Sequence, residues 1–177
     1  MLKPEQVRQN NEEKFNRMVL ENHQKIYSMF RRMVPSHDEA DDLTQETFIK
    51  VYKNLSKFRN ESSAYTWIYR IAVNTGLNYL RRQKIRQTVG LEKINVPAEN
   101  NHSHSGEFQN VYLENAIKKL PSKQQMVIIL RSYQGLTFRE IGKIMDSTEN
   151  AAKVNYAHAL KNLKRIFDDM GVSYETV

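Results

Sequence analysis

Apolar residues recur at helical spacing through most of the first half of the chain, with polar residues between them. The pattern predicts helices over residues 4–34, 38–55 and 63–87, and the breaks between them are too short to hold a strand. Ser36 stands three residues before Glu39, an arrangement typical of a capping box, so we expect the second helix to begin there. The first half therefore reads as one helical domain.

The helical pattern stops between residues 88 and 106, where the sequence is polar, turn-prone and without hydrophobic period. We interpret this part as an interdomain linker. Helical spacing then resumes at residue 108. The predicted fold is all-α, with two small helical domains at residues 1–86 and 108–177 joined by a flexible linker over residues 87–107.

The second half shows breaks at residues 120–121, 134–135 and 146–148, which divide it into four predicted helices. Ser122 with Gln125, and Thr137 with Glu140, have the spacing of capping boxes at two of the helix starts. The last two helices, up to about residue 168, are arranged as a helix-turn-helix.

The helix predicted at 38–55 has two different faces. One face is the expected core stripe, made of Ala40, Thr47, Phe48, Val51 and Leu55. The opposite face carries Asp42, Gln45, Glu46 and Ile49 at spacings of three and four. Such acids usually only face water, but an outward isoleucine among them is typical of a helix that contacts another protein.

The helix predicted at 63–87 carries apolar residues on two sides, so we expect it to be largely buried. Between those sides runs a stripe made of Trp67, Arg70, Asn74, Asn78 and Arg81. Aromatic rings offer faces for unpaired bases, amides offer paired donors and acceptors, and arginine neutralises phosphate, so the stripe indicates single-stranded nucleic acid. The alternative is that Trp67 is a core residue.

The composition favours a polyanionic partner. The 177 residues include 27 Lys and Arg against 20 Asp and Glu, which gives a formal charge of +7 and a pI near 9.5. The chain has no Cys, which excludes disulfides, thiolate metal sites and Cys nucleophiles. We find neither a membrane span nor a signal peptide, and we expect a cytoplasmic protein.

A family resemblance rests on the motif at 41–48 (DDLTQETF) followed by residues 58–74 (FRNESSAYTWIYRIAVN). Together these resemble domain 2 of the extracytoplasmic function (group 4) sigma factors of bacterial RNA polymerase. The resemblance implies that Asp42, Gln45, Glu46 and Ile49 bind the clamp helices of the polymerase beta-prime subunit. It also implies that the loop after this helix captures a flipped base of the promoter minus-ten element.

The residues predicted to bind minus-ten DNA, from the resemblance and from the stripe together, are Phe58, Arg59, Asn60, Glu61, Ser62, Ser63, Tyr65, Trp67, Arg70, Asn74, Asn78 and Arg81.

The helix-turn-helix is similar to domain 4 of the same family, which reads the minus-thirty-five element as duplex. Gly142 is the small residue required where two helices cross closely, and Asp146 tolerates the left-handed conformation at the turn. The buried stripe of the last helix is predicted to be Ala152, Tyr156, Ala159, Leu163 and Ile166. The residues predicted to bind minus-thirty-five DNA are Asn150, Lys153, Val154, Ala157, His158, Lys161 and Arg165.

The sequence thus predicts an alternative sigma factor, with no enzymatic activity, cofactor or metal of its own. Its implied partners are core RNA polymerase, single-stranded and duplex promoter DNA and, since the family often has one, an anti-sigma factor. Two other classes stay open: a helix-turn-helix repressor that acts without polymerase, and a nuclease that holds Mg²⁺ on the acids of residues 38–46. His102 and His104 are expected to be solvated rather than metal ligands.

Overall fold

The computed structural model describes residues 4–58, 63–88 and 105–169. The helices in the first part are α1 (Pro4–Arg31), α2 (His37–Asn54), the short 3₁₀ helix η1 (Leu55–Lys57) and α3 (Ala64–Thr88). The second part contains α4 (Ser105–Lys118), α5 (Ser122–Ile128), one turn of π-helix η2 (Ile129–Tyr133), α6 (Phe138–Ile144) and α7 (Glu149–Asp169). No strand occurs in the ranges given, so the all-α prediction is confirmed.

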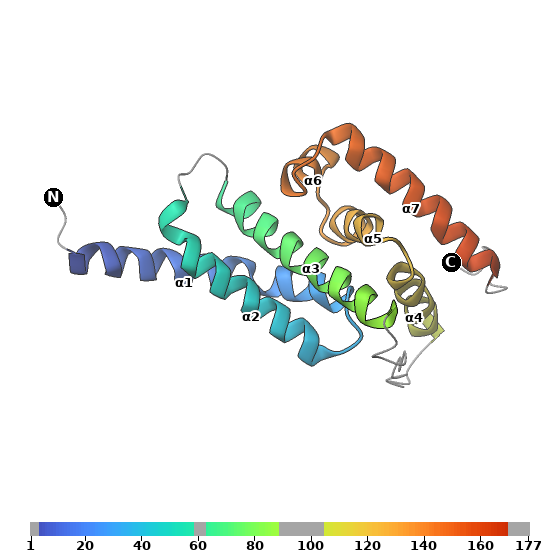
Figure 1. Ribbon diagram of the computed structural model, residues 1–177, viewed down its shortest axis with the longest axis horizontal. Coiled ribbons are helices and arrows are strands. Elements are labelled where there is room, and N and C mark those ends of the chain that lie inside the picture. Colours follow the sequence, from blue (N-terminus) through green and yellow to red (C-terminus); the bar gives the residue numbers. More distant parts are fainter. Residues whose placement is uncertain (1–3, 59–62, 89–104, 170–177) are drawn as a thin grey trace.

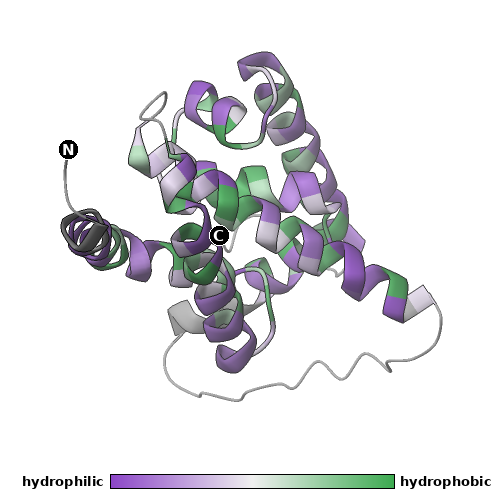
Figure 2. Ribbon diagram, turned by 60° about the vertical axis from the view of Figure 1, so that its left-hand side comes forward, coloured by the Kyte–Doolittle hydropathy of each residue, from purple (hydrophilic) through white to green (hydrophobic). Residues whose placement is uncertain are grey.

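The two groups of helices lie side by side (Figure 1). Helices α1, α2 and α3 pack on one another, and α4, α5 and α6 surround the inner face of α7. Helix α3 also contacts α5 and α6, so it joins the two groups. Apolar residues are concentrated where the helices face one another (Figure 2), and the buried side chains form one cluster that runs through both groups.

The predicted ends of the helices agree with the structure at most positions. Ser36 is the N-cap of α2, where its hydroxyl accepts a hydrogen bond from the Glu39 amide at 3.2 Å. Thr137 and Glu140 form a complete capping box at the start of α6. Gly135 (φ 69°) and Asp146 (φ 50°) adopt the left-handed conformation at the two turns, as their types allow.

One predicted capping box is wrong. Helix α5 begins at Ser122 itself, and the N-cap residue is Pro121, which has no side-chain cap. Gln125 is instead buried, with only 1% of its surface exposed. A proline directly before the first helical residue fixes an extended approach to the helix, which moves the N-cap one residue earlier than the Ser–Gln spacing indicated.

The boundaries of the linker differ slightly from the prediction. Helix α3 continues to Thr88 and α4 begins at Ser105, two residues before the predicted end of the linker at 107. Positions 89–104, including His102 and His104, lie outside the described residues. Within the ranges given above, no helix has the length and apolar character needed to cross a membrane.

Candidate protein and nucleic-acid interfaces

Helix α2 buries one face and presents the other, as its sequence predicts. All five residues of the expected core stripe are buried. On the opposite face Asp42 and Gln45 are exposed, and 53% of the surface of Ile49 is open to solvent. An aliphatic side chain therefore stands on the surface among polar ones, which is the arrangement expected for a protein contact.

Glu46 has a structural contact on this same helix. Its carboxylate lies 2.6 Å from the Lys50 ammonium group and 4.0 Å from the guanidinium of Arg82 on α3. The Lys50 ammonium group also donates a hydrogen bond to the Thr75 hydroxyl at 3.0 Å. Glu46 therefore helps to hold α2 on α3, and only part of its side chain is available to a partner.

Tyr52 belongs to the outward face of α2 but was missed by the sequence reasoning. Half of its surface is exposed, and its ring meets the Phe15 ring edge-on with centroids 5.1 Å apart. It follows Ile49 by three residues, so the same helical wheel could have found it. The exposed apolar patch of α2 is thus made of Ile49 and Tyr52.

The predicted stripe on α3 is divided by the structure into two parts. Asn74, Asn78 and Arg81 are exposed to solvent, and the Arg81 guanidinium donates a hydrogen bond to the Asn78 side-chain oxygen at 3.2 Å. Trp67 is half-buried, with its ring centroid 4.9 Å from that of Phe58. Trp67 also packs against the core, as expected if it is a core residue. Its role in binding nucleic acid stays a prediction.

Arg70 is exposed, but its guanidinium group already has a hydrogen-bond partner within the protein. Its guanidinium donates a hydrogen bond of 2.8 Å to the carbonyl oxygen of Lys143, at the end of α6. The neighbouring Tyr69 hydroxyl donates to the Gln134 side-chain oxygen at 3.0 Å, and the amide nitrogen of Gln134 donates to Ser28 at 3.2 Å. These contacts join the two helical groups, so a strand that uses Arg70 requires α6 to leave this position.

Tyr65 stands at the start of α3 and is half-buried. Its ring lies 4.2 Å from that of Tyr69, and the Lys25 ammonium group lies 5.8 Å from its centroid. Burial raises the pKa of the Tyr65 hydroxyl above its usual value, and it raises that of Tyr69 as well. Both phenols are therefore neutral hydrogen-bonding groups at physiological pH. Four other predicted minus-ten residues, Arg59, Asn60, Glu61 and Ser62, lie outside the described residues.

The helix-turn-helix prediction is confirmed in the structure by α6 and α7. Ala152, Ala159 and Leu163 of the predicted stripe are buried, and Tyr156 and Ile166 are half-buried. All seven residues predicted for minus-thirty-five DNA are exposed on α7, namely Asn150, Lys153, Val154, Ala157, His158, Lys161 and Arg165. Leu160, 48% exposed, lies on the open surface too and was not assigned a role from sequence.

The crossing of α6 and the turn before α7 is too close for any side chain at Gly142. A Cβ atom there would lie 2.9 Å from the carbonyl carbon of Thr148 and 3.0 Å from the amide nitrogen of Glu149. The Ser147 amide donates to the Gly142 carbonyl at 2.8 Å, which fixes the turn. The angle of α7 therefore depends on glycine at this position.

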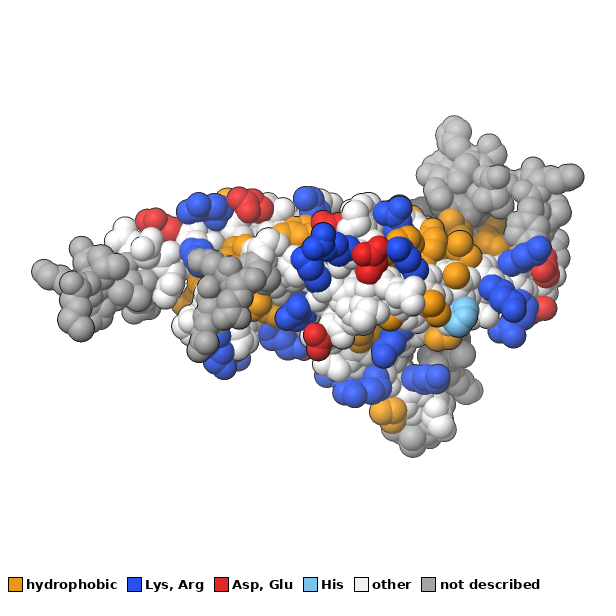
Figure 3. All heavy atoms as spheres, turned by 90° about the horizontal axis from the view of Figure 1, so that it is seen from above, with side chains coloured by type: hydrophobic (Ala, Val, Ile, Leu, Met, Phe, Trp, Pro, Cys, Tyr) orange, Lys and Arg blue, Asp and Glu red, His pale blue; other side chains and the backbone are white. Residues whose placement is uncertain are grey.

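The charge distribution supports a polyanion on this side of the molecule. Seen from the side of α6 and α7, Lys and Arg side chains cover more of the visible face than Asp and Glu do (Figure 3). Glu149, one of the acids of α7, is paired with Lys153 at 2.7 Å, and this pairing lowers the pKa of its carboxyl group. Positive charge thus dominates this face of the molecule, as a polyanionic partner requires.

The capping box of α6 gives a testable stability prediction. Hydrogen bonds from the Thr137 side chain and backbone lower the pKa of the Glu140 carboxyl group below its ordinary value of 4.5. We expect Thr137→Ala to cost about 1 kcal/mol of unfolding free energy at neutral pH. Because the folded pKa is depressed, the contribution of the carboxylate is present above pH 4.5 and is lost as the pH falls through the folded pKa.

Thermal unfolding at several pH values measures this effect. The difference between Thr137→Ala and the natural chain should shrink in acid, whereas Ser147→Ala, an exposed change nearby, should alter little at any pH. A Thr137→Ala difference that is absent at neutral pH would show that the box does not stabilise α6.

Comparison with known proteins places both halves of the chain in one family. Residues 18–85 match the family described as "Sigma-70 region 2", and residues 110–163 match "Sigma-70, region 4". The ECF RNA polymerase sigma-E factor of Haemophilus influenzae is 35% identical over 155 residues, which cover 80% of this chain and 81% of the relative. The protein of the same name from Escherichia coli is 36% identical over 154 residues, covering 80% of each chain.

Solved structures share the fold. The sigma factor RpoE of Bartonella quintana, solved with the anti-sigma factor NepR, superposes with a TM-score of 0.66 at 19% identity, over 88% of this chain and 97% of that one. CnrH, solved with the cytosolic domain of CnrY, gives 0.67 at 16% identity, over 93% and 94%. Matches to region 2 and then region 4, with 35–36% identity to sigma-E factors over 80% of the chain, show that this protein belongs to the extracytoplasmic function (ECF) sigma factors.

Proposed function

We propose that three surfaces divide the work of this alternative sigma factor, which recognises promoters and supports transcription initiation. The outward face of α2 would bind the clamp helices of the polymerase beta-prime subunit, α3 the opened minus-ten strand, and α7 the minus-thirty-five duplex. The observation that carries this proposal is that each predicted set has exposed members on a face opposite the core. The working units would be residues 1–86 and 108–177, joined by residues 87–107.

The polymerase surface is supported by Ile49. Ile49 is 53% exposed, with Asp42 and Gln45 on the same face. Contact of this apolar side chain with water is unfavourable in the free protein, so its burial in a complex would stabilise that complex. Tyr52 extends the apolar patch by one further turn of α2.

The minus-ten surface is supported by Asn74, Asn78 and Arg81, which are exposed along α3. Their amide and guanidinium groups fit base edges and phosphates. The aromatic pair Phe58 and Trp67 lies near the start of the same helix and offers ring faces for unstacked bases.

Asn74→Ala tests this surface. We expect it to weaken binding of the polymerase complex to single-stranded minus-ten DNA by about tenfold, since one bidentate contact contributes about 1–3 kcal/mol. Fluorescence anisotropy of a labelled strand measures the change, and Asn16→Ala, an exposed change on α1, is the matched control. Unchanged affinity and base preference in Asn74→Ala would refute the assignment.

This chain would carry out no chemistry itself, and catalysis would belong to the polymerase in the cytoplasm. The acids that prompted the nuclease alternative stand on a single helix, α2, whereas metal-binding carboxylates usually converge from different elements. Incubation of DNA with the protein and Mg²⁺ alone should leave the DNA intact, and cleavage that purification does not remove would favour the nuclease.

An anti-sigma factor is a further proposed partner. Among similar solved structures, the sigma factor RpoE was solved with the anti-sigma factor NepR, and CnrH with the cytosolic domain of CnrY. Exposed apolar side chains on α2 (Ile49 and Tyr52) and on α7 (Val154 and Leu160) offer contact points for such an inhibitor.

A further inference from the structure

The end of α7 that begins at Glu149 decides which bases this helix can read. A recognition helix enters the major groove with its N-terminal residues against the base edges. Residues from His158 onward lie about 14 Å or more from Glu149 along α7, at a rise of about 1.5 Å per residue. They are better placed for the phosphates at the rim of the groove, which leaves the turns from Glu149 to Ala157 for the bases.

Several polar side chains of these turns already have partners within the protein. The Asn155 side-chain nitrogen donates a hydrogen bond of 2.9 Å to the carbonyl oxygen of Ala151, one turn earlier on the same helix. The Lys153 ammonium group lies 2.7 Å from the Glu149 carboxylate. No arginine occurs between positions 149 and 157. Guanine is most often read by arginine or lysine, so these turns lack the free cation that a guanine contact usually requires.

The open face of the same turns carries one amide and one branched apolar side chain. Asn150 is exposed, and 46% of the surface of Val154, four residues later, is open to solvent. The Asn150 side chain has no hydrogen bond to any residue in the part of the chain that the structure describes. Valine is a weaker helix former than alanine or lysine, so helix propensity gives no reason for Val154 at an exposed position. Apolar side chains are visible between the cations on this side of the molecule (Figure 3).

This pair of side chains matches the major-groove edge of A·T base pairs. The Asn150 amide can donate a hydrogen bond to adenine N7 and accept one from the adenine N6 amino group. Thymine is the base that carries a methyl group in this groove, and Val154 can bury that methyl group. The two positions are about 6 Å apart along α7, which corresponds to about two base steps of about 3.4 Å each.

We infer that Asn150 and Val154 set the base preference of the minus-thirty-five element. Asn150 reads an adenine, and Val154 buries the methyl group of a thymine about two base pairs away, so the part of the element under these turns is made of A·T pairs. The lysines of α7 contact phosphates and add affinity without base preference. The inference rests on the proposed binding of minus-thirty-five duplex by α7 and deepens it by naming the bases.

Uracil substitution in the DNA tests the valine contact. The protein is the full chain assembled with core polymerase, and the probe is a fluorescein-labelled duplex with the minus-thirty-five block, but not the minus-ten block, of a promoter that this holoenzyme transcribes. Uracil in place of each thymine in turn removes one methyl group and keeps the base pair. Anisotropy should show one position at which uracil weakens binding about fourfold, as expected for the exposure of one buried carbon. Val154→Ala should abolish that response.

Substitution by 7-deazaadenine tests Asn150, because it replaces the N7 acceptor of adenine by a C–H group. At one position it should weaken binding of the natural chain about fivefold, which is about half of a bidentate contact, and it should have no effect on Asn150→Ala. Asn155→Ala is the matched control, because it removes the same kind of side chain from the same helix but one already bonded to Ala151. This control should keep both responses. Thermal unfolding of each variant verifies that α7 is intact.

A uracil response that Val154→Ala leaves unchanged, or a deazaadenine response that persists in Asn150→Ala, would overturn the inference. An element that responds to 7-deazaguanine alone would overturn it too, since guanine would then carry the preference. A preference for A·T pairs that no base substitution affects would assign the reading to the shape of the groove instead. If the natural holoenzyme binds this duplex no better than an unrelated duplex of the same length, the proposed function of α7 itself fails.

Discussion

Truncation of Ile49 to alanine is expected to reduce the affinity for core polymerase by about 30-fold and to abolish run-off transcription at limiting concentrations of the protein. An apolar anchor at the centre of a protein contact is typically worth about 2 kcal/mol or more, and 1.4 kcal/mol is a tenfold change in affinity. The side chain is already 53% exposed in the free protein, so its loss leaves no cavity. Folding should therefore be unaffected.

Binding of labelled core polymerase and run-off transcription measure the effect. Leu20→Ala is the matched control, because Leu20 is 84% exposed on α1 and lies outside the assigned polymerase face. Gln45→Ala should weaken binding in the same direction as Ile49→Ala. Normal polymerase binding and transcription by both variants would instead refute the assignment of this face of α2 to polymerase.

Gly142→Ala is expected to destabilise the helix-turn-helix and to weaken binding of duplex minus-thirty-five DNA. The new Cβ would meet the backbone of Thr148 and Glu149 at 2.9 and 3.0 Å, and backbone atoms cannot rotate away as a side chain can. Overpacking of this kind costs about 1–3 kcal/mol, and the better helix propensity of alanine returns about 1 kcal/mol of that. We expect a net loss of up to about 2 kcal/mol and a Tm lower by a few degrees.

Calorimetry measures the Tm of the Gly142→Ala variant, and a duplex-binding assay measures its affinity for minus-thirty-five DNA. Lys143→Ala is the control, because it alters an exposed side chain of the same helix and keeps the backbone carbonyl that accepts from Arg70. If Gly142→Ala unfolds at the natural temperature and binds duplex normally, the close crossing does not set the angle of α7.

Features that depend on neighbours in sequence could be predicted before the structure. The Thr137 and Glu140 capping box and the outward Ile49 follow from spacings of three and four residues along one helix. Asp146 likewise takes the left-handed conformation that its place between two helices predicts. Local periodicity and turn chemistry are sufficient for these.

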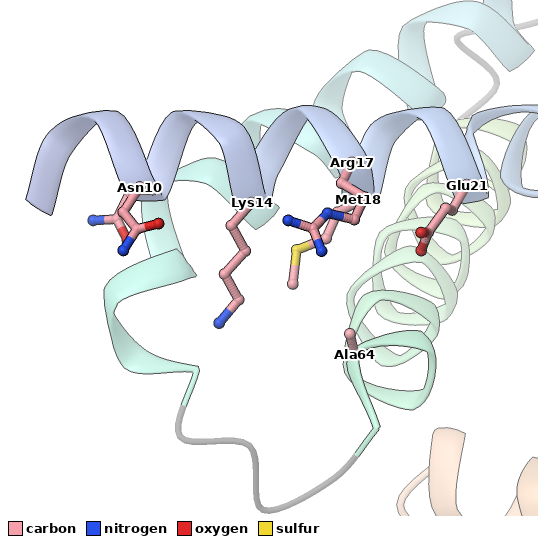
Figure 4. Close-up of a pocket in the computed structure, with 7 residues that line it drawn as sticks. Asn10, Lys14, Arg17, Met18, Glu21 and Ala64 are labelled. Atoms are coloured by element: carbon pink, nitrogen blue, oxygen red, sulfur yellow. The ribbon is translucent and has the colours of Figure 1, made fainter. Parts of the chain in front are cut away.

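Contacts between distant residues could not be predicted in this way. Helical wheels gave Trp67, Arg70 and Asn74 one shared stripe, but the hydrogen bond of Arg70 to Lys143 depends on how α6 packs beside α3. A cavity of about 510 Å³ beside Lys14 depends similarly on the crossing of α1 and the start of α3 (Figure 4). A wheel describes one helix and contains no information on its neighbours.

The central claim is that this chain gives core polymerase its choice of promoter, and transcription from a random promoter library tests it most directly. Core polymerase with this protein should produce transcripts whose templates share two enriched blocks, one near minus ten and one near minus thirty-five. Ile49→Ala should lose the transcripts, and Gly142→Ala should weaken selection of the upstream block. No transcripts above core polymerase alone, or a single duplex motif bound equally well without polymerase, would contradict the claim.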